Sequence, residues 1–137
     1  MGNGTSIWPP YYPLNVPPAE AIDTSGTAFR LVRSIPPAAI DFRSTFEDYK
    51  ARGQPLPTER PFWQACGTSL HTELEGSRVT RARFPPLRER RIVVGQLAIT
   101  HGKMMSTAGF HSSHITVWFR VDAAPETSFT LDAEATT

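Results

Sequence analysis

Two β-forming runs in the C-terminal half constrain the fold of this chain more than any other feature. They cover residues 91–100 and 114–121, and the segment between them, residues 101–113, carries the glycine and serine residues typical of a loop. Val, Ile, Thr, Trp and Phe are frequent in the runs, and these β-branched and aromatic side chains favour an extended backbone. The sequence therefore predicts a C-terminal β-hairpin in which the two runs pair.

Side chains on a strand alternate between the two faces of a sheet, so each run has two distinct faces. The apolar face of the second run carries Ile115, Val117, Phe119 and Val121. Its mixed face carries His114, Thr116, Trp118 and Arg120. The apolar face of the first run carries Val93, Leu97 and Ile99 beside Gly95. We expect the apolar faces to be interior. We expect the mixed face, with its imidazole, hydroxyl, indole and guanidinium groups, to form a binding face together with Arg30.

The preceding part of the chain predicts strands that alternate with helices. A strand is expected over residues 28–34, and a helix follows from an apolar stripe at spacings of three and four. The stripe consists of Ala39, Phe42, Phe46 and Tyr49. Residues 67–70 predict a short strand or a turn. Thr72 and Glu75 then match a capping box, which predicts the start of a second helix.

The N-terminal residues 1–26 differ in composition from the rest of the chain. Five prolines argue against both a helix and a central strand in this segment. The segment also carries large apolar side chains, namely Ile7, Trp8, Tyr11, Tyr12 and Leu14. We therefore expect an extended arm. It either lies across its own domain and covers Trp118, or docks on a partner or a second copy of the chain.

The expected elements combine into one α+β domain over residues 27–122. It would hold a small mixed or antiparallel sheet, two helices and the C-terminal β-hairpin. A length of 137 residues suits one domain. Residues 123–137 predict a flexible tail in which Phe129 and Leu131 could add a short edge strand.

Charge and cysteine content narrow the classes of partner and compartment. The net charge of +1 gives no global field that would attract nucleic acid or an anionic membrane. Cys66 is the only cysteine, which excludes an internal disulfide, predicts a small core residue and favours a reducing, cytoplasmic setting. No apolar run approaches the roughly 18 residues of a membrane span, so we expect no membrane contact.

Several side-chain combinations are candidates for chemistry. Four histidines are present, His71, His101, His111 and His114. Neither an HExxH pattern nor a cysteine pair accompanies them, so we expect hydrogen-bonded histidines and no metal site. Ser69, His114 and Asp122 could form a nucleophilic triad, but the G-x-S-x-G pattern is absent. A basic cluster surrounds Phe84: Arg78, Arg81, Arg83, Arg88, Arg90 and Arg91. Such a cluster either binds phosphate beside a stacked base or forms a solvated helix end.

A succession of short motifs resembles a known group of proteins. The motifs are Phe29-Arg30-Leu31-Val32, Pro36-Pro37, Asp41-Phe42, Gly67-Thr68-Ser69-Leu70, Arg83-Phe84-Pro85 and His114-Ile115-Thr116-Val117-Trp118. Over about residues 28–121 the succession resembles small bacterial α+β proteins whose layout is similar to ADP-ribosyltransferase-like domains. The resemblance implies that Arg30 and Ser69 contact NAD. On the late strand, where such a transferase would be expected to place its glutamate, this chain offers His114.

Three functions follow as alternatives. The first is a small cytoplasmic protein-binding module of a bacterial or phage conflict system (toxin, immunity or defence), without a cofactor and with another protein or a second copy of itself as partner. The second is an NAD-using ADP-ribosyltransferase-like enzyme, with Arg30, Ser69 and His114 as candidate catalytic residues. The third is a nucleic-acid binder that uses the arginine cluster, which the net charge disfavours. One cleft that holds Arg30, Ser69 and an acid would favour the enzyme, whereas an apolar surface around Trp8 and Tyr12 would favour protein binding.

Overall fold

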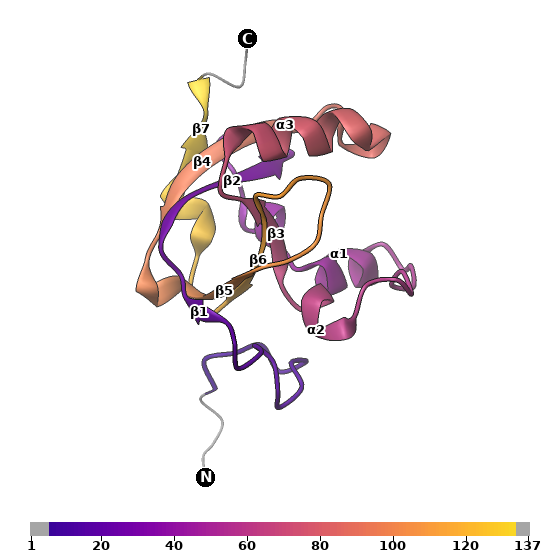
Figure 1. Cartoon of the computed structure of the whole chain (residues 1–137), viewed down its shortest axis with the longest axis vertical. Helices are drawn as coiled ribbons and strands as arrows, with labels where there is room; N and C mark the ends of the chain where they lie inside the picture. Colours follow the sequence, from indigo (N-terminus) through magenta and orange to yellow (C-terminus); the bar gives the residue numbers. More distant parts are fainter. Residues whose placement is uncertain (1–5, 134–137) are drawn as a thin grey trace.

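The computed structural model describes residues 6–133, and these residues form one seven-stranded antiparallel sheet with the order β1-β5-β6-β3-β2-β4-β7. The strands are β1 (Ile22–Asp23), β2 (Gly26–Val32), β3 (Thr68–His71), β4 (Arg91–Leu97), β5 (Gly102–Ser106), β6 (His114–Phe119) and β7 (Phe129–Leu131). The sheet is curled in Figure 1. Its two edge strands are β1 and β7. The α+β class predicted from the sequence is confirmed, and the sheet is larger than expected.

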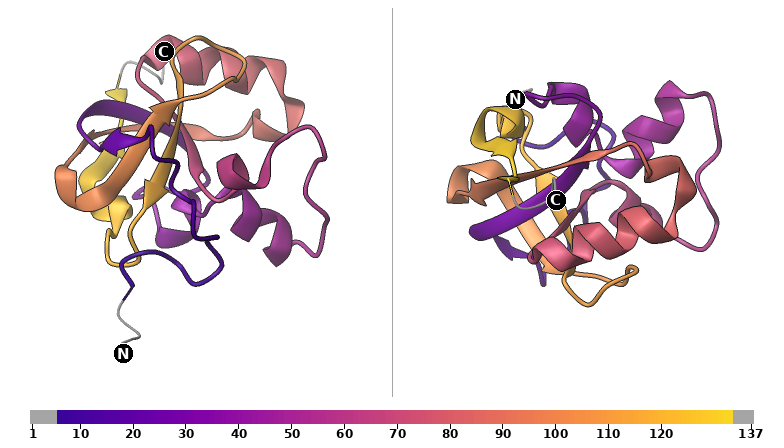
Figure 2. Two further views of the ribbon diagram at one scale, coloured as in Figure 1. Left: turned by 60° about the horizontal axis from the view of Figure 1, so that its bottom comes forward. Right: turned by 90° about the horizontal axis from the view of Figure 1, so that it is seen from above.

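In the described part of the chain, three α-helices and four short 3₁₀ turns connect the strands. The α-helices are α1 (Thr45–Ala51), α2 (Phe62–Ala65) and α3 (Leu74–Arg83). The 3₁₀ turns are η1 (Ala39–Phe42), η2 (Pro85–Leu87), η3 (Ile99–His101) and η4 (Pro125–Ser128). In the left view of Figure 2, α3 runs along the top of the molecule, and α1 and α2 lie on the side opposite β7. In the described residues no helix has the length and apolar content needed to cross a membrane.

The helix expected from the stripe between Ala39 and Tyr49 is divided in two. The first part, η1, ends at Phe42, and the backbone is extended at Arg43. The Ser44 side chain then accepts a hydrogen bond from the amide of Glu47, while the Glu47 carboxylate accepts one from the amide of Ser44. This reciprocal capping box starts a new helix, α1, at Thr45. The capping box expected at Thr72 is wrong. The Thr72 amide bonds to the carbonyl oxygen of Ser113, and α3 begins at Leu74 without a side-chain cap.

The β-hairpin predicted between residues 91–100 and 114–121 is also wrong. β4 pairs with β2 and β7, whereas β6 pairs with β3 and β5. The strand β5 occupies the segment expected to be a loop, and the C-terminal hairpin is β5–β6. Gly102 makes this pairing possible, because its φ is +149° and a Cβ at this position would collide with the carbonyl oxygen of Trp118.

The predicted apolar faces meet in the main core. This core gathers residues from one face of the curled sheet and from η1: Ala28, Val32, Phe42, Leu70, Val93, Leu97, Ile115, Val117 and Phe129. Phe119 packs against it and is partly buried. Val121 and Ile99 are exposed because β6 ends at Phe119 and β4 ends at Leu97, so the alternation does not extend to them.

The N-terminal arm lies across its own domain. Trp8, Tyr11, Tyr12 and Val16 pack with Trp63 of α2 and with Trp118 of β6. The hydroxyl of Tyr11 shares a hydrogen bond of 2.8 Å with the Ser44 hydroxyl. Of the two arrangements considered from the sequence, the described part of the arm takes the intramolecular one. Residues 1–5 of the expected arm lie outside the described residues.

Much of the segment expected to form a flexible tail is part of the fold. Residues 125–131 form η4 and β7, and Phe129 enters the main core. The edge strand expected at Phe129 and Leu131 is β7, which pairs with β4. The last part of the expected tail, residues 134–137, lies outside the described residues.

Candidate functional site: a cationic cleft where two strands diverge

The candidate site forms where two neighbouring strands part. β2 and β3 pair only through Phe29 and His71, whereas β2 continues along β4 and β3 continues along β6. The side chain of Arg30 spans the divergence. Its Nη1 donates to the carbonyl oxygen of Ser69 at 2.8 Å, and its Nε donates to the carbonyl oxygen of Asp41 at 2.9 Å. Burial lowers the pKa of this guanidinium to about 10.

A cleft of about 690 Å³ opens beside Arg30, which lies within the range of about 300–1,000 Å³ that suits small molecules and cofactors. It is bounded by α3, α1 and residues 107–113, the loop between β5 and β6. Figure 1 shows this loop passing between α3 and α1. The lining includes Arg30 from β2, Ser69 and His71 from β3, and His114 from β6. The cleft thus brings together the three candidate catalytic residues predicted from the sequence.

Positive charge dominates the lining of the cleft. Among the described residues, the cationic lining consists of Arg30, Arg33, Arg43, Arg52, Arg60 and Arg90, and the acidic lining of Asp41, Asp48 and Glu59. Burial and the nearby Arg33 guanidinium lower the pKa of Arg90. The buried Nε of Arg43 has no hydrogen-bond partner within the described part of the chain. Crowded, incompletely partnered guanidinium groups are the features that bind phosphate and carboxylate groups.

Two of the three acidic side chains, Asp41 and Asp48, already form hydrogen bonds or ion pairs with neighbouring residues. Burial alone would raise the pKa of Asp41. Hydrogen bonds from the Ala38 and Arg33 amides and from the Ser34 hydroxyl outweigh this effect and hold the pKa below its usual value. Asp48 lies between three guanidinium groups, those of Arg33 at 3.9 Å, Arg43 at 3.2 Å and Arg52 at 3.6 Å. One carboxylate shared by three arginines leaves the wall of the cleft with a positive excess.

His71 and His114 face each other across the β3–β6 ladder, with ring centroids 5.4 Å apart. His71 joins the sheet to α3, because its Nδ1 lies 3.3 Å from the Ser77 hydroxyl and its Nε2 lies 3.2 Å from the Thr80 hydroxyl. Burial, reinforced by the neighbouring His114, lowers the pKa of His71 to about 4. Burial also lowers the pKa of His114. Both rings are therefore neutral at pH 7.

The hydrogen bonds of His114 fix which ring nitrogen carries the proton. Its Nδ1 lies 3.2 Å from the carbonyl oxygen of Thr107 and 3.0 Å from the Thr107 hydroxyl. A carbonyl oxygen only accepts, so Nδ1 of the neutral ring carries the hydrogen. The lone pair is then on Nε2. His114 therefore supplies the cleft with a neutral hydrogen-bond acceptor that can also take a proton.

The rest of the binding face predicted from the sequence lies outside the cleft. Trp118 is fully buried beneath the arm, and its Nε1 donates to the carbonyl oxygen of Trp63 at 2.9 Å. The Thr116 hydroxyl bonds to the Thr107 hydroxyl at 2.7 Å. Arg120 follows the end of β6, and its Nε lies 3.4 Å from the Asp122 carboxylate. Of the predicted face, only Arg30 and His114 reach the cleft. His114 is the first residue of β6, and the strand lies under the arm farther along, at Trp118.

The remaining candidate residues take structural positions. Asp122 pairs with Arg120 and is not part of the cleft, so the geometry does not assemble a triad with Ser69 and His114. Burial raises the pKa of the Cys66 thiol to about 11, and the residue packs in the cluster beneath the arm. Within the described residues, no group of three or more His, Cys, Asp or Glu side chains could hold a metal ion.

Sequence reasoning missed several residues of the cleft. His71 follows Ser69 by two positions, and the period of two on a strand places both on one face, so the strand pattern could have found it. Arg43 and Arg52, which flank α1, carry no such signal, because their convergence on the cleft depends on where the fold places α1. Comparison with protein-family models, with curated proteins and with solved structures finds no match to this chain.

Proposed function

We propose that the cleft binds NAD and that the protein is an enzyme of the ADP-ribosyltransferase type. The supporting observation is that Arg30, Ser69 and His114 come from three different strands and line one cationic cleft together with acidic side chains. The motif resemblance implies NAD contacts for the first two of these residues. The excess of arginines supplies what the pyrophosphate of a dinucleotide requires.

Each of the three residues has a separate role in this proposal. Arg30 and the other arginines bind the phosphates, and the Ser69 hydroxyl bonds to a ribose. His114 acts as the general base through Nε2, and a glutamate at this position would act as an anion. A neutral acceptor gives less stabilisation to a developing positive charge on the ribose than a carboxylate does.

The proposed reaction is transfer from the C1′ carbon of the nicotinamide ribose. The bond between C1′ and the nicotinamide nitrogen breaks, and its electron pair leaves with nicotinamide. A hydroxyl oxygen of water or of an acceptor forms the new bond to C1′. The hydroxyl proton passes to Nε2 of His114, which is unprotonated at neutral pH, and from there to solvent.

Mass spectrometry of NAD incubated with the purified protein tests this proposal. We expect release of nicotinamide together with free ADP-ribose or a modified acceptor. Both products should fall in Arg90→Gln and His114→Asn. Arg88→Gln is the matched control, because Arg88 is exposed and does not line the cleft. If NAD stays intact at high enzyme concentration and the protein has no measurable affinity for NAD, the proposal is wrong.

The protein-binding alternative depends on a surface that is partly buried within the chain. It relied on an accessible Trp118 and on an arm with free aromatic side chains. Trp118 is fully buried, and Trp8, Tyr11 and Tyr12 are partly buried in packing within the same chain. The arginine cluster proposed for nucleic acid is also partly engaged, since Arg81 donates to the carbonyl oxygen of Arg90 at 3.0 Å. We therefore place the function in the cleft. A role in a bacterial or phage conflict system stays a prediction.

A further inference from the structure

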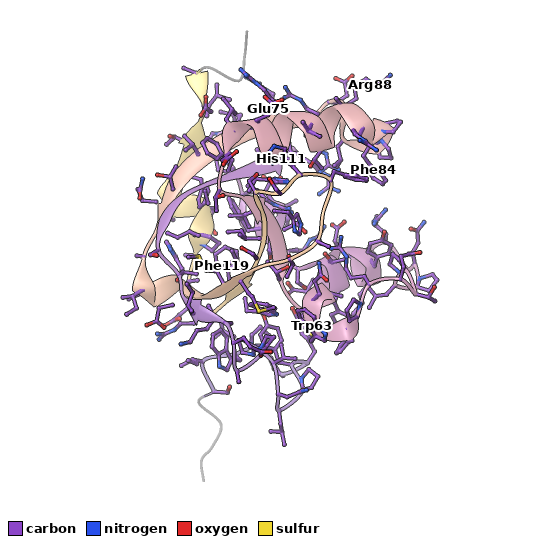
Figure 3. All side chains as sticks on the ribbon, viewed as in Figure 1. Trp63, Glu75, Phe84, Arg88, His111 and Phe119 are labelled. Atoms are coloured by element: carbon purple, nitrogen blue, oxygen red, sulfur yellow. The ribbon has the colours of Figure 1, made fainter. Side chains whose placement is uncertain are left out.

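Two phenylalanines lie exposed and adjacent on the lining of the cleft. Phe84 follows the last residue of α3, and Phe110 belongs to the loop of residues 107–113. Their side chains are 43% and 50% exposed, and their ring centroids lie 6.4 Å apart with 35° between the planes. Figure 3 places Phe84 at the C-terminal end of α3, above the side of the molecule where α1 lies. Neither ring is needed to fill the main core.

The surroundings of the two rings favour a charged, planar ligand. Arg83 lies over Phe110, with its guanidinium carbon 5.6 Å from the ring centroid. Arg90 lines the same cleft. A purely apolar partner would leave these guanidinium groups without an anion. A purine nucleotide satisfies both features, because its base stacks on an aromatic ring while its phosphates bind arginine.

The loop that carries Phe110 is held firmly to the sheet. The Thr107 amide donates to the carbonyl oxygen of His114 at 3.2 Å, and the Thr107 hydroxyl bonds to that of Thr116 at 2.7 Å. Gly109 lies so close to His114 that a Cβ would come within 2.5 Å of its Cγ. Phe110 is thus presented from a loop that packs directly on the His114 ring. A ligand stacked on Phe110 would be placed at a fixed position relative to His114.

We infer that Phe84 and Phe110 form the subsite for the purine base of the nucleotide ligand. This inference rests on the proposed function, because the phosphates of the same ligand occupy the arginine wall of the cleft. The base stacks on the exposed ring faces. In NAD the base is the adenine, at the opposite end from the nicotinamide ribose that reacts.

Calorimetric titration with ADP-ribose, AMP and ribose 5-phosphate tests the subsite. Phe110→Leu and Phe84→Leu keep an apolar side chain and remove the stacking face. Each substitution should lower the affinity for ADP-ribose and AMP by about fivefold to a hundredfold, the range expected for one base–aromatic stack. The affinity for ribose 5-phosphate should stay unchanged. Phe62→Leu is the matched control, because Phe62 is also exposed but packs edge to face with Phe46 outside the cleft.

The outcomes separate the subsite from the enzyme proposal. Suppose that the Phe110 variant selectively loses affinity for AMP and ADP-ribose while the parent protein leaves NAD intact. That result would support the subsite and contradict the enzyme proposal. Turnover of NAD with affinities that are unchanged in both Phe variants would support the enzyme and overturn the subsite. Equal loss of ADP-ribose and ribose 5-phosphate would also overturn the subsite, because the variants would then act on the cleft as a whole.

Discussion

Arg30 Nη1 donates to the carbonyl oxygen of Ser69 at 2.8 Å, so one side chain joins β2 to β3 at the point where the two strands part. The same guanidinium also bonds to the carbonyl oxygen of Asp41 and lines the cleft. Arg30 therefore supports the site and belongs to it. Loss of activity in an Arg30 variant is informative about binding only when its stability is measured in parallel.

Arg30→Lys should destabilise the fold although it keeps the charge. Lysine lacks the planar fork that bonds to two carbonyl groups at once, and one or both carbonyls would lose their partner. We expect the free energy of unfolding to fall by roughly 2–4 kcal/mol in urea denaturation. Arg33→Lys is the control, because Arg33 is more exposed and shares Asp48 with two other arginines. Its loss should stay below about 1 kcal/mol. Equal losses in the two variants would contradict the bridging role of Arg30.

Trp118→Ala should unfold much of the protein and not merely remove a contact surface. The side chain is fully buried and bonds to the carbonyl oxygen of Trp63. Truncation should cost about 3–5 kcal/mol. Trp118→Phe keeps much of the apolar volume, so its smaller loss should reflect mainly the missing hydrogen bond and the smaller ring. A folded Trp118→Phe variant should keep the nucleotide affinity of the parent. Loss of nucleotide affinity in this folded variant would show instead that Trp118 belongs to the binding site.

The sequence allowed the sheet faces to be predicted but not the strand partners. Alternation depends only on neighbouring residues, so the interior positions of Ile115 and Val117 followed directly. Pairing depends on which strands meet across the chain, and two long β-forming runs look like a hairpin whether or not they touch. The short strand β5 was missed because glycine, lysine and serine near its ends resemble a loop. Gly102 was the useful signal, since the close approach to β6 needs a residue without Cβ.

The candidate site was predictable to a similar extent. Arg30, Ser69 and His114 were identified from short motifs, and the fold brings them into one cleft. Trp118 and Arg120 were grouped with His114 on strand periodicity alone. Periodicity fixes which face a side chain takes, but not what covers that face. The arm covers Trp118, whereas the space above His114 stays open to the cleft.

Deletion of residues 1–20 should destabilise the protein without changing its oligomeric state. The arm packs Trp8, Tyr11 and Val16 against Trp118 and Trp63, and apolar burial is worth roughly 25 cal/mol per Å². The deletion keeps β1 in place. We expect a lower melting temperature, tryptophan fluorescence shifted to longer wavelength, and the same mass per particle in light scattering once the missing residues are subtracted. A melting curve identical to that of the full chain would mean that the arm contributes no packing energy.

Gly76→Ala should destabilise the protein, although alanine is the better helix former by about 1 kcal/mol. Gly76 is buried in α3, and a Cβ there would collide with the Ser113 hydroxyl and come within 2.5 Å of Cδ2 of His71. We expect a loss of about 1–3 kcal/mol, since α3 would have to move away from the sheet. The measurement is urea denaturation of Gly76→Ala beside Gly53→Ala. Gly53 has open space around it, so its cost should come only from its φ of +67°. A more stable Gly76→Ala would show that α3 can shift freely.

The stability of the protein should fall with pH below about 6.5, and His71 should account for part of the change. Burial holds the pKa of His71 near 4 in the folded chain, against 6.5 for a free imidazole. Between these values the unfolded chain binds a proton that the folded chain does not. The contribution is therefore complete above pH 6.5 and is lost as the pH falls toward 4. Its slope should reach about 1.4 kcal/mol per pH unit for one proton. Urea denaturation of the parent and of His71→Gln from pH 4 to 8 measures the difference, because glutamine can still bond to the Ser77 and Thr80 hydroxyls but does not titrate. Parallel stability curves for the two proteins over this range would contradict the assignment to His71.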